Sequence, residues 1–188
     1  MNMVLLPTPM TREAFLEWAE RQERPYEFNG REPVPMNGGN VGHYVIATNI
    51  SSELSQRLKG GKCTAISAGA GVATIGNAVR FPDAVVTCTA FKLNDRLVPN
   101  PVIVFEVGSP SSVRNDWVVK LQEYAAVPSI LRYVILEQDS VAAGVFSRTS
   151  GDAGWTVAAV TADQALSLPE ISVEIPLREL YAGLDLPA

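Results

Sequence analysis

Histidine and cysteine are scarce in this chain of 188 residues, which has one histidine, His43, and two cysteines, Cys63 and Cys88. A structural zinc site usually takes four nitrogen or sulfur ligands, so two cysteines cannot complete one. A Ser-His-Asp hydrolase is also disfavoured, because the segment 108–110 lacks the nucleophile-elbow pattern and a single histidine is present to act as the base. We expect both cysteines to be buried, reduced thiols of a cytoplasmic protein.

Basic residues and long apolar runs are also lacking. The chain has 15 lysines and arginines against 20 acidic residues, and its formal net charge is −5 at pH 7. This balance argues against a broad basic surface for nucleic acid, although a local basic cleft, or a carboxylate cluster neutralised by bound cations, remains compatible with it. No apolar run approaches the roughly 18 residues of a membrane span, so we expect no membrane partner.

The length and apolar content favour a single folded domain over residues 1–188. Domains usually have roughly 100–200 residues. Hydrophobic residues make up 47% of this chain, which is enough for a core that needs no disulfide or metal. Residues 1–10 carry no positively charged segment before an apolar stretch, so they are expected to be a flexible N-terminus rather than a secretory signal.

Local patterns predict helices that alternate with strands. Thr11 is a good N-cap residue, and the apolar stripe that follows predicts a helix over 11–22. Asn29 and Gly30 predict a type I′ hairpin turn between two short strands. Apolar residues at spacings of four predict an amphipathic helix over 42–59. The other expected elements are strands at 63–68, 72–75, 84–89 and 101–107, a helix at 113–126, a strand at 131–136, a hairpin of 141–147 with 155–160, and a short helix at 176–181.

This order of elements predicts an α/β fold with a mixed sheet flanked by helices. The segment 101–107 is almost entirely apolar, as expected of a strand that is buried on both faces. A right-handed crossover through the helix at 113–126 would place the strand at 131–136 parallel to it.

Two carboxylates interrupt apolar segments of the predicted sheet. Asp83 directly precedes the apolar run 84–86, and Glu106 lies inside the run 102–107. If these strands form an antiparallel pair whose connection is centred on residues 94 and 95, Asp83 faces Glu106. Two carboxylates directly across a ladder repel each other unless a cation lies between them, and Mg²⁺ (or Mn²⁺) is the natural candidate for oxygen ligands.

Lys120 lies on the helix that follows the strand of Glu106. Asp116 and Lys120 are four residues apart and therefore share a helix face. The lysine ammonium can reach the end of the strand, where it would orient a water or stabilise charge on a phosphate. Two metal-binding carboxylates and a lysine are sufficient for phosphodiester hydrolysis. A purely structural ion pair of Glu106 with Lys120 or Arg80 is the alternative.

These residues resemble a known group, the Uma-two-type family of restriction endonucleases, within the PD-(D/E)XK nuclease superfamily. The resemblance covers about residues 11–185. The motifs that carry it are segments 80–83, 105–112 and 120–124 with Asp116, preceded by segment 26–30 and His43.

The resemblance implies a restriction-endonuclease-like core with an added N-terminal hairpin, magnesium dependence and action on DNA. It makes Asp83 and Glu106 the catalytic acids that bind the metal. The family's usual lysine two residues after the second acid is absent, because Gly108 stands there, and Lys120 takes its part. Glu27 matches the glutamate of the family's early hairpin and is implied as an accessory acid.

The predicted function is therefore that of a metal-dependent endonuclease acting on DNA, and cleavage of two strands would suit a homodimer. The alternative is a catalytically silent module that binds nucleic acid or protein, which the negative net charge favours. His43 is expected to be a capping or surface residue, with a cleft position beside Glu27 as the alternative. Arg132 and the segment 137–139 depart from the family pattern, which weakens inference about the substrate.

Overall fold

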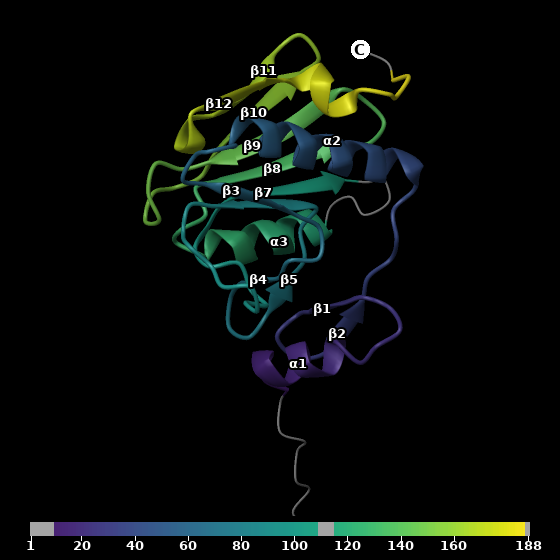
Figure 1. Cartoon of the computed structure of the whole chain (residues 1–188), viewed down its shortest axis with the longest axis vertical. Coiled ribbons are helices and arrows are strands. Elements are labelled where there is room, and N and C mark those ends of the chain that lie inside the picture. The colour runs from purple at the N-terminus through teal and green to yellow at the C-terminus, as the bar shows by residue number, and fades with distance from the viewer. Residues whose placement is uncertain (1–9, 109–114, 187–188) are drawn as a thin grey trace, which may run out of the picture.

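A six-stranded mixed sheet forms the centre of the molecule in a computed structural model that describes residues 10–108 and 115–186 (Figure 1). The strand order is β10-β9-β8-β7-β6-β3. β7 and β8 are parallel and are joined through α3 (Asn115–Ala125), whereas the other neighbouring strands are antiparallel. The predicted α/β fold with a mixed sheet is therefore confirmed. The strands are β3 (Thr64–Ser67), β6 (Ala84–Thr87), β7 (Pro101–Gly108), β8 (Arg132–Glu137), β9 (Ala142–Ser147) and β10 (Thr156–Thr161).

Two helices cover opposite faces of this sheet (Figure 1). Side chains alternate along β7, so Ile103 and Phe105 lie in the core cluster of α2 (Val41–Arg57), whereas Val104 lies in the cluster that contains Tyr124 of α3. β7 is buried along nearly its whole length, as its continuous apolar sequence predicts. The buried residues of α2 are Ile46, Ile50 and Leu54, spaced by four as the sequence pattern indicated.

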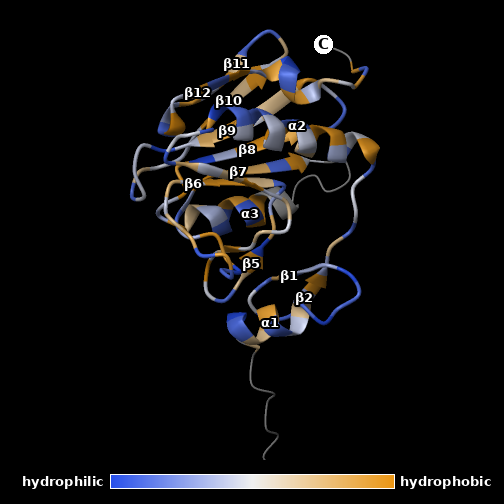
Figure 2. Cartoon of the chain, in the orientation of Figure 1, coloured by the Kyte–Doolittle hydropathy of each residue, from blue (hydrophilic) through white to orange (hydrophobic). Residues whose placement is uncertain are grey.

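A second, smaller sheet carries the N-terminal segment. Its order is β2-β1-β5-β4, so the predicted hairpin of β1 (Tyr26–Phe28) and β2 (Pro33–Pro35) is extended by two short strands from the middle of the chain, β4 (Val72–Ala73) and β5 (Val79–Arg80). α1 (Arg12–Ala19) packs against this sheet through Phe15, whose ring stacks on Phe28 at 4.9 Å. In Figure 2, α1 alternates between hydrophilic and hydrophobic colour, as expected of a helix with one buried side.

The turn between β1 and β2 is longer than the predicted two-residue type I′ turn. The ladder leaves residues 29–32 outside it. A type I′ turn needs positive φ at both central residues, but Gly30 alone of the predicted pair has it, at +88°. Asn29 instead accepts hydrogen bonds from the N–H groups of Arg31 and Glu32, each at 2.9 Å, which closes a wider loop.

The C-terminal segment forms a two-stranded sheet that the sequence patterns did not predict. β11 (Ala165–Leu168) pairs with β12 (Val173–Pro176) around the 3₁₀ helix η1 (Pro169–Ile171). The predicted final helix is a 3₁₀ helix, η2 (Leu177–Tyr181). Leu166, Ile175 and Leu177 join the core cluster of α2, so this segment completes the core between that helix and the central sheet.

Some predictions concern residues outside the described ranges. The expected flexible N-terminus at 1–10 lies outside them except for Met10, and so does the expected start of the helix at 113. The single domain over residues 1–188 stays a prediction. None of the helices in the described part of the chain has the length and apolar character needed to cross a bilayer.

Cys63 and Cys88 form a disulfide, so the expectation of two buried, reduced thiols is wrong. Their neighbours Thr64 and Thr87 are opposite each other in the antiparallel ladder of β3 and β6, which brings the next residue of each strand face to face. Cys88 is exposed rather than buried. The strand pairing that joins these cysteines has no local sequence signature.

Removing the disulfide is expected to destabilise the fold. The disulfide joins residues 25 positions apart and so limits the conformations of the unfolded chain. The double variant Cys63→Ser/Cys88→Ser lacks this limit, so its free energy of unfolding should be lower by about 2–4 kcal/mol. Urea unfolding of oxidised wild type against the variant measures this difference. Wild type treated with a reductant is the control and should match the variant; equal stability of oxidised and reduced wild type would contradict the prediction.

Candidate active site

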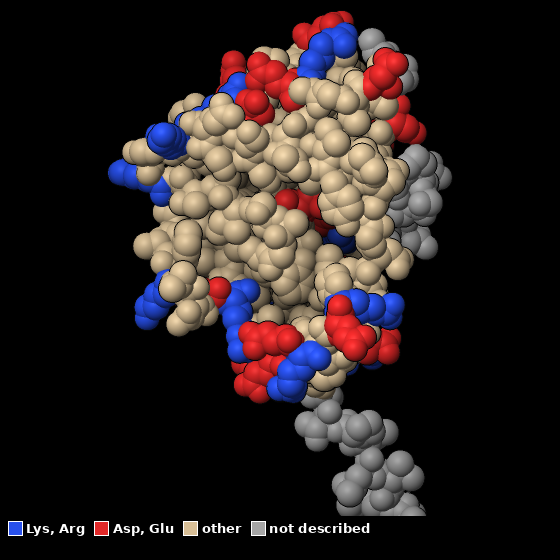
Figure 3. All heavy atoms as spheres, turned by 45° about the vertical axis from the view of Figure 1, so that its right-hand side comes forward, with Lys and Arg blue, Asp and Glu red and all other residues tan. Residues whose placement is uncertain are grey.

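The four residues predicted to form the site all line one large cleft between the central sheet and the N-terminal sheet. The cleft volume is about 1620 Å³, well above the roughly 300–1,000 Å³ of a typical small-molecule pocket. Figure 3 shows acidic and basic atoms inside a hollow on this side of the molecule, surrounded by uncharged residues. The predicted residues that line it are Glu27, Asp83, Glu106 and Lys120.

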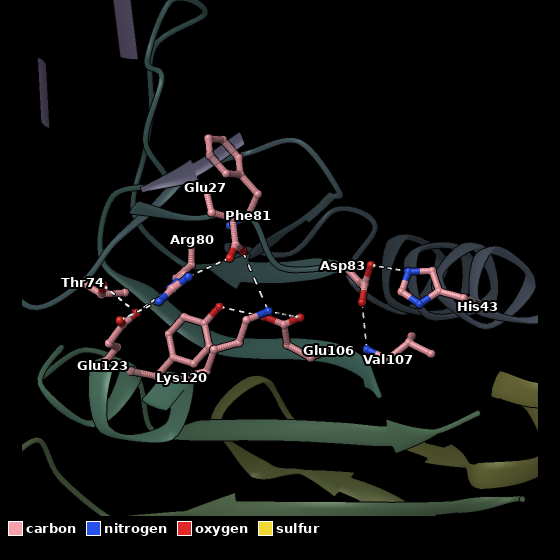
Figure 4. A network of polar contacts seen from close by, with 11 residues as sticks. Glu27, His43, Thr74, Arg80, Phe81, Asp83, Glu106, Val107, Lys120 and Glu123 are labelled. Carbon is pink, nitrogen blue, oxygen red and sulfur yellow. Dashed lines mark hydrogen bonds and ion pairs between the residues drawn. The ribbon is translucent and has the colours of Figure 1, made fainter. Parts of the chain in front are cut away.

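The register of β6 and β7 places Asp83 and Glu106 at matching positions. Ala84 is opposite Phe105 in the antiparallel ladder, so Asp83 and Glu106 are the next residue of each strand, as predicted. The register shifts farther along, between Val86 and Thr87, which leaves the pairing beside the site unaffected. Figure 4 shows both carboxylates at the same end of the two strands.

Glu106 is held by two side chains of α3. The Lys120 ammonium lies 2.9 Å from each carboxylate oxygen, and the Tyr124 hydroxyl donates a hydrogen bond to Oε1 at 2.9 Å. Lys120 and Tyr124 are one helical turn apart, so both extend from the same face of α3 onto β7. The structure therefore brings Glu106 and Lys120 together, and this ion pair is one that the sequence analysis considered.

Burial and charge determine the protonation of this group. Burial raises the pKa of Glu106, and the nearby carboxylates of Asp83 and Glu27 add to that effect, while the Lys120 ammonium opposes it. Burial disfavours the charged form of Lys120, but attraction to Glu106 and Glu27 outweighs it and raises the pKa of the lysine. Burial and then the charge of Glu106 raise the pKa of Tyr124 well above its ordinary value. Lys120 is thus a cation and Tyr124 a hydrogen-bond donor at neutral pH.

Asp83 makes a different set of contacts. Its Oδ2 accepts a hydrogen bond from the Val107 N–H at 2.8 Å, and its Oδ1 lies 2.9 Å from Nε2 of His43. The expectation of a capping or surface role for His43 is therefore wrong: Asn40 caps α2, and the His43 side chain is 17% exposed. The hydrogen bond to Asp83 raises the pKa of His43, although burial opposes the shift.

Glu27 belongs to a second ion-pair group that continues from the first (Figure 4). Arg80 reaches Oε2 of Glu27 at 2.7 Å and makes a two-point contact with Glu123, at 2.6 and 2.7 Å. The Glu27 carboxylate also lies 3.8 Å from the Lys120 ammonium, so this cation connects the two groups. Arg80 pairs with Glu27 and Glu123 rather than with Glu106, which answers the alternative ion pair considered from the sequence.

The chain is similar to known proteins over most of its length. The model of the Uma2 family, described as "Putative restriction endonuclease", matches residues 12–178. The chain belongs to the Uma2 family. The resemblance inferred from the sequence motifs is thereby confirmed. A curated relative is "Uncharacterized protein slr1290" of Synechocystis sp., 27% identical over 177 residues that make up 93% of each chain.

A solved structure shares the fold of this Uma2 chain. It is a crystal structure of a "putative nuclease belonging to DUF820" from Anabaena variabilis, with a TM-score of 0.71 and 16% sequence identity. The match covers 93% of this chain and 98% of the other. The family and the shared fold therefore support a nuclease of the restriction-endonuclease-like kind.

Two further residues of the Uma2 site, Glu123 and Tyr124, were not assigned a role from the sequence. Glu123 and Tyr124 had a signal, since they follow Lys120 at the three- and four-residue spacings of one helix face. His43 was part of the family resemblance, and the structure places it in the cleft, as the alternative for this residue had it, with Asp83 as its hydrogen-bond partner. The backbone of Asp116 is part of α3, but its side chain lies outside the described residues.

The carboxylates of the cleft are the groups that could hold a divalent cation. Among the residues described, no group of three or more His, Cys, Asp or Glu side chains is arranged to hold a metal ion. Mg²⁺ commonly binds through one or two carboxylates, with water and substrate phosphate as its other ligands. The matching strand positions of Asp83 and Glu106 place two such oxygen donors at the same end of β6 and β7. The chemistry of these two side chains therefore fits a divalent cation.

The contact of His43 with Asp83 should make stability depend on pH. Because the pKa of His43 is raised on folding, its contribution is fully present below the unfolded pKa of about 6.5 and is lost as pH rises through the folded pKa. His43→Gln should therefore cost about 1 kcal/mol near pH 5.5 and less near pH 8.5. Urea unfolding in metal-free buffer measures the difference. A gap between variant and wild type that widens as pH rises would contradict this.

Proposed function

We propose that this Uma2 protein is a divalent-metal-dependent endonuclease that hydrolyses phosphodiester bonds in DNA. One observation supports the proposal above the others: Asp83, Glu106 and Lys120 come from three different elements and line the same cleft, although a carboxylate inside an apolar strand is costly to bury. Family membership and the shared nuclease fold agree with this reading.

Each residue has a part that follows from its contacts. Asp83 and Glu106 would hold Mg²⁺ (or Mn²⁺), and when bound this ion polarises a phosphoryl oxygen and lowers the pKa of its water. The Lys120 ammonium, kept protonated by the carboxylates around it, stabilises negative charge that develops on the phosphate. Glu27 orients Lys120 and is the accessory acid, and Arg80 in turn holds Glu27.

The alternative is a catalytically silent module with the same fold that binds nucleic acid or protein. The ion pair of Lys120 with both oxygens of Glu106 favours it, because such a pair is complete without metal or substrate. A homodimer, which would supply two sites for two strands, and a cytoplasmic location both stay proposals. The disulfide is more usual in an oxidising compartment.

Hydrolysis should require the two acids and the lysine. Asp83→Asn, Glu106→Gln and Lys120→Met should each slow hydrolysis by about 10²–10⁴-fold, because each acid variant loses an anionic ligand for the metal and the lysine variant loses the cation that stabilises charge on the phosphate. The assay follows nicking of a supercoiled plasmid and cutting of a single-stranded circle with Mg²⁺, and with EDTA as the metal-free arm.

Glu170→Gln is the matched control for that assay. Glu170 is another carboxylate with little exposure (10% of its side chain) in a two-point ion pair, with Arg132 at 2.9 and 3.0 Å, and does not line the cleft. This variant should hydrolyse DNA at the wild-type rate. Equal rates for wild type and Asp83→Asn would end the assignment, as would hydrolysis that persists in EDTA.

Metal binding can be measured apart from hydrolysis. Calorimetric titration with Mn²⁺ or Mg²⁺ should show binding to wild type and to Glu170→Gln. Asp83→Asn and Glu106→Gln should bind at least about tenfold more weakly, because each loses one anionic ligand. Unchanged affinity in Glu106→Gln would show that this carboxylate is not a ligand.

A further inference from the structure

Two aromatic rings lie exposed in the cleft that contains the candidate active site. Tyr44, at the start of α2, is 54% exposed, and Phe91, in the connection from β6 to β7, is 46% exposed. Most other aromatic rings of the described residues pack against one another or lie in the core clusters, as Phe15 does with Phe28. Tyr44 and Phe91 instead leave ring surface open to whatever enters the cleft.

The ring of Tyr44 is held in place beside the candidate catalytic residues. It meets the His43 ring edge-on, with centroids 5.2 Å apart and planes at 81°. Its hydroxyl accepts a hydrogen bond from the Gly39 N–H at 3.3 Å. His43 in turn contacts Asp83, the candidate metal ligand. The exposed ring of Tyr44 therefore lies next to a residue that touches this ligand.

Apolar side chains continue this surface. Leu93, Val119 and Val34 line the same cleft with 98%, 44% and 37% of their surface exposed. Charged side chains in Figure 3 lie at the top, at the bottom and along the left edge of this face, and uncharged residues surround the hollow. The cleft therefore offers contact to flat or apolar groups over much of its lining.

Among the residues that the structure describes, cations that could hold phosphates are few in the cleft. Four described cationic residues line it: Arg80, Lys92, Arg96 and Lys120. Arg80 and Lys120 are in the ion-pair groups of the site, and Arg96 pairs with Glu20 at 2.9 Å. Of these four cations, Lys92 alone has no ion pair with another described residue. A duplex presents its phosphates outward and its bases stacked inside, so it is bound mainly through many cationic contacts.

From these observations we propose that the cleft binds single-stranded nucleic acid, with bases stacked on Tyr44 and Phe91, in preference to duplex. This inference rests on the proposed endonuclease function and specifies the class of nucleic acid on which the enzyme acts. Unpaired bases expose the ring faces that aromatic side chains can stack on, whereas the bases of a duplex are already stacked on one another, and such stacking needs no particular base sequence. A protein partner would also suit an apolar surface, but the position of Tyr44 beside the phosphodiester-hydrolysing group favours a nucleic acid.

Equilibrium binding in EDTA tests this without hydrolysis. A fluorescein-labelled oligodeoxynucleotide of mixed sequence is offered as a single strand and annealed to its complement, and fluorescence anisotropy gives the affinity. The single strand should bind wild type at least about tenfold more tightly than the duplex does. Tyr44→Ala and Phe91→Ala should each weaken single-strand binding by about 5–100-fold, through loss of one stacked base.

Conservative and distant variants serve as controls. Tyr44→Phe and Phe91→Tyr keep an aromatic ring and should bind within about twofold of wild type. Val157→Ala removes an exposed apolar side chain, 69% exposed, on β10 outside the cleft, and should bind as wild type does. Thermal unfolding of each variant confirms that the fold is kept.

The outcomes separate this inference from the proposed function. Duplex binding as tight as single-strand binding, or alanine variants that bind like wild type, would overturn the inference even if plasmid is nicked with Mg²⁺. Stacking-dependent binding of the single strand without hydrolysis of any DNA would support the inference and end the proposed endonuclease. Failure to bind either form would overturn the inference and leave a protein partner as the occupant of the cleft.

Discussion

The buried ion pair of Glu106 with Lys120 is the interaction on which the rest of the site depends. A carboxylate in the middle of an apolar strand loses its hydration, and this cost is compensated only when other groups in the protein replace the lost water. Lys120 contacts both oxygens of Glu106, and Tyr124 donates a further hydrogen bond to it. Both contacts form only when α3 lies against β7 in one rotational position. The packing of this helix therefore determines the arrangement of charges in the site.

The constraint extends from Lys120 into the N-terminal sheet. Lys120 lies near Glu27 of β1, Glu27 contacts Arg80 of β5, and Arg80 contacts Glu123 of α3. This closed set of opposite charges joins the smaller sheet to the helix of the central sheet, along the cleft that separates them. Two of the cations that line the cleft, Arg80 and Lys120, are used for these internal ion pairs. The net charge of the whole chain is also negative.

The fold was predictable where local patterns have a strong physical cause. Continuous apolar sequence identified β7, a spacing of four identified α2, and an apolar strand after a helix identified the parallel pair of β7 and β8. The small sheet of β11 and β12 was not predicted, because its short strands are separated by a 3₁₀ helix and lack a recognised turn sequence. The joining of the N-terminal hairpin to β5 pairs residues such as Phe28 and Val79, which no local pattern connects.

The sequence by itself determined that Asp83 faces Glu106 and that Lys120 lies on the helix beside them. Antiparallel register and helical periodicity are fixed geometries, so short stretches of chain suffice to place these residues. Only the tertiary structure decided that His43 contacts Asp83, 40 residues away, that Arg80 contacts a glutamate 53 residues away, and that two cysteines 25 residues apart form a disulfide. These contacts arise when separate elements pack together, and the residues involved carry no local periodicity that specifies their partners.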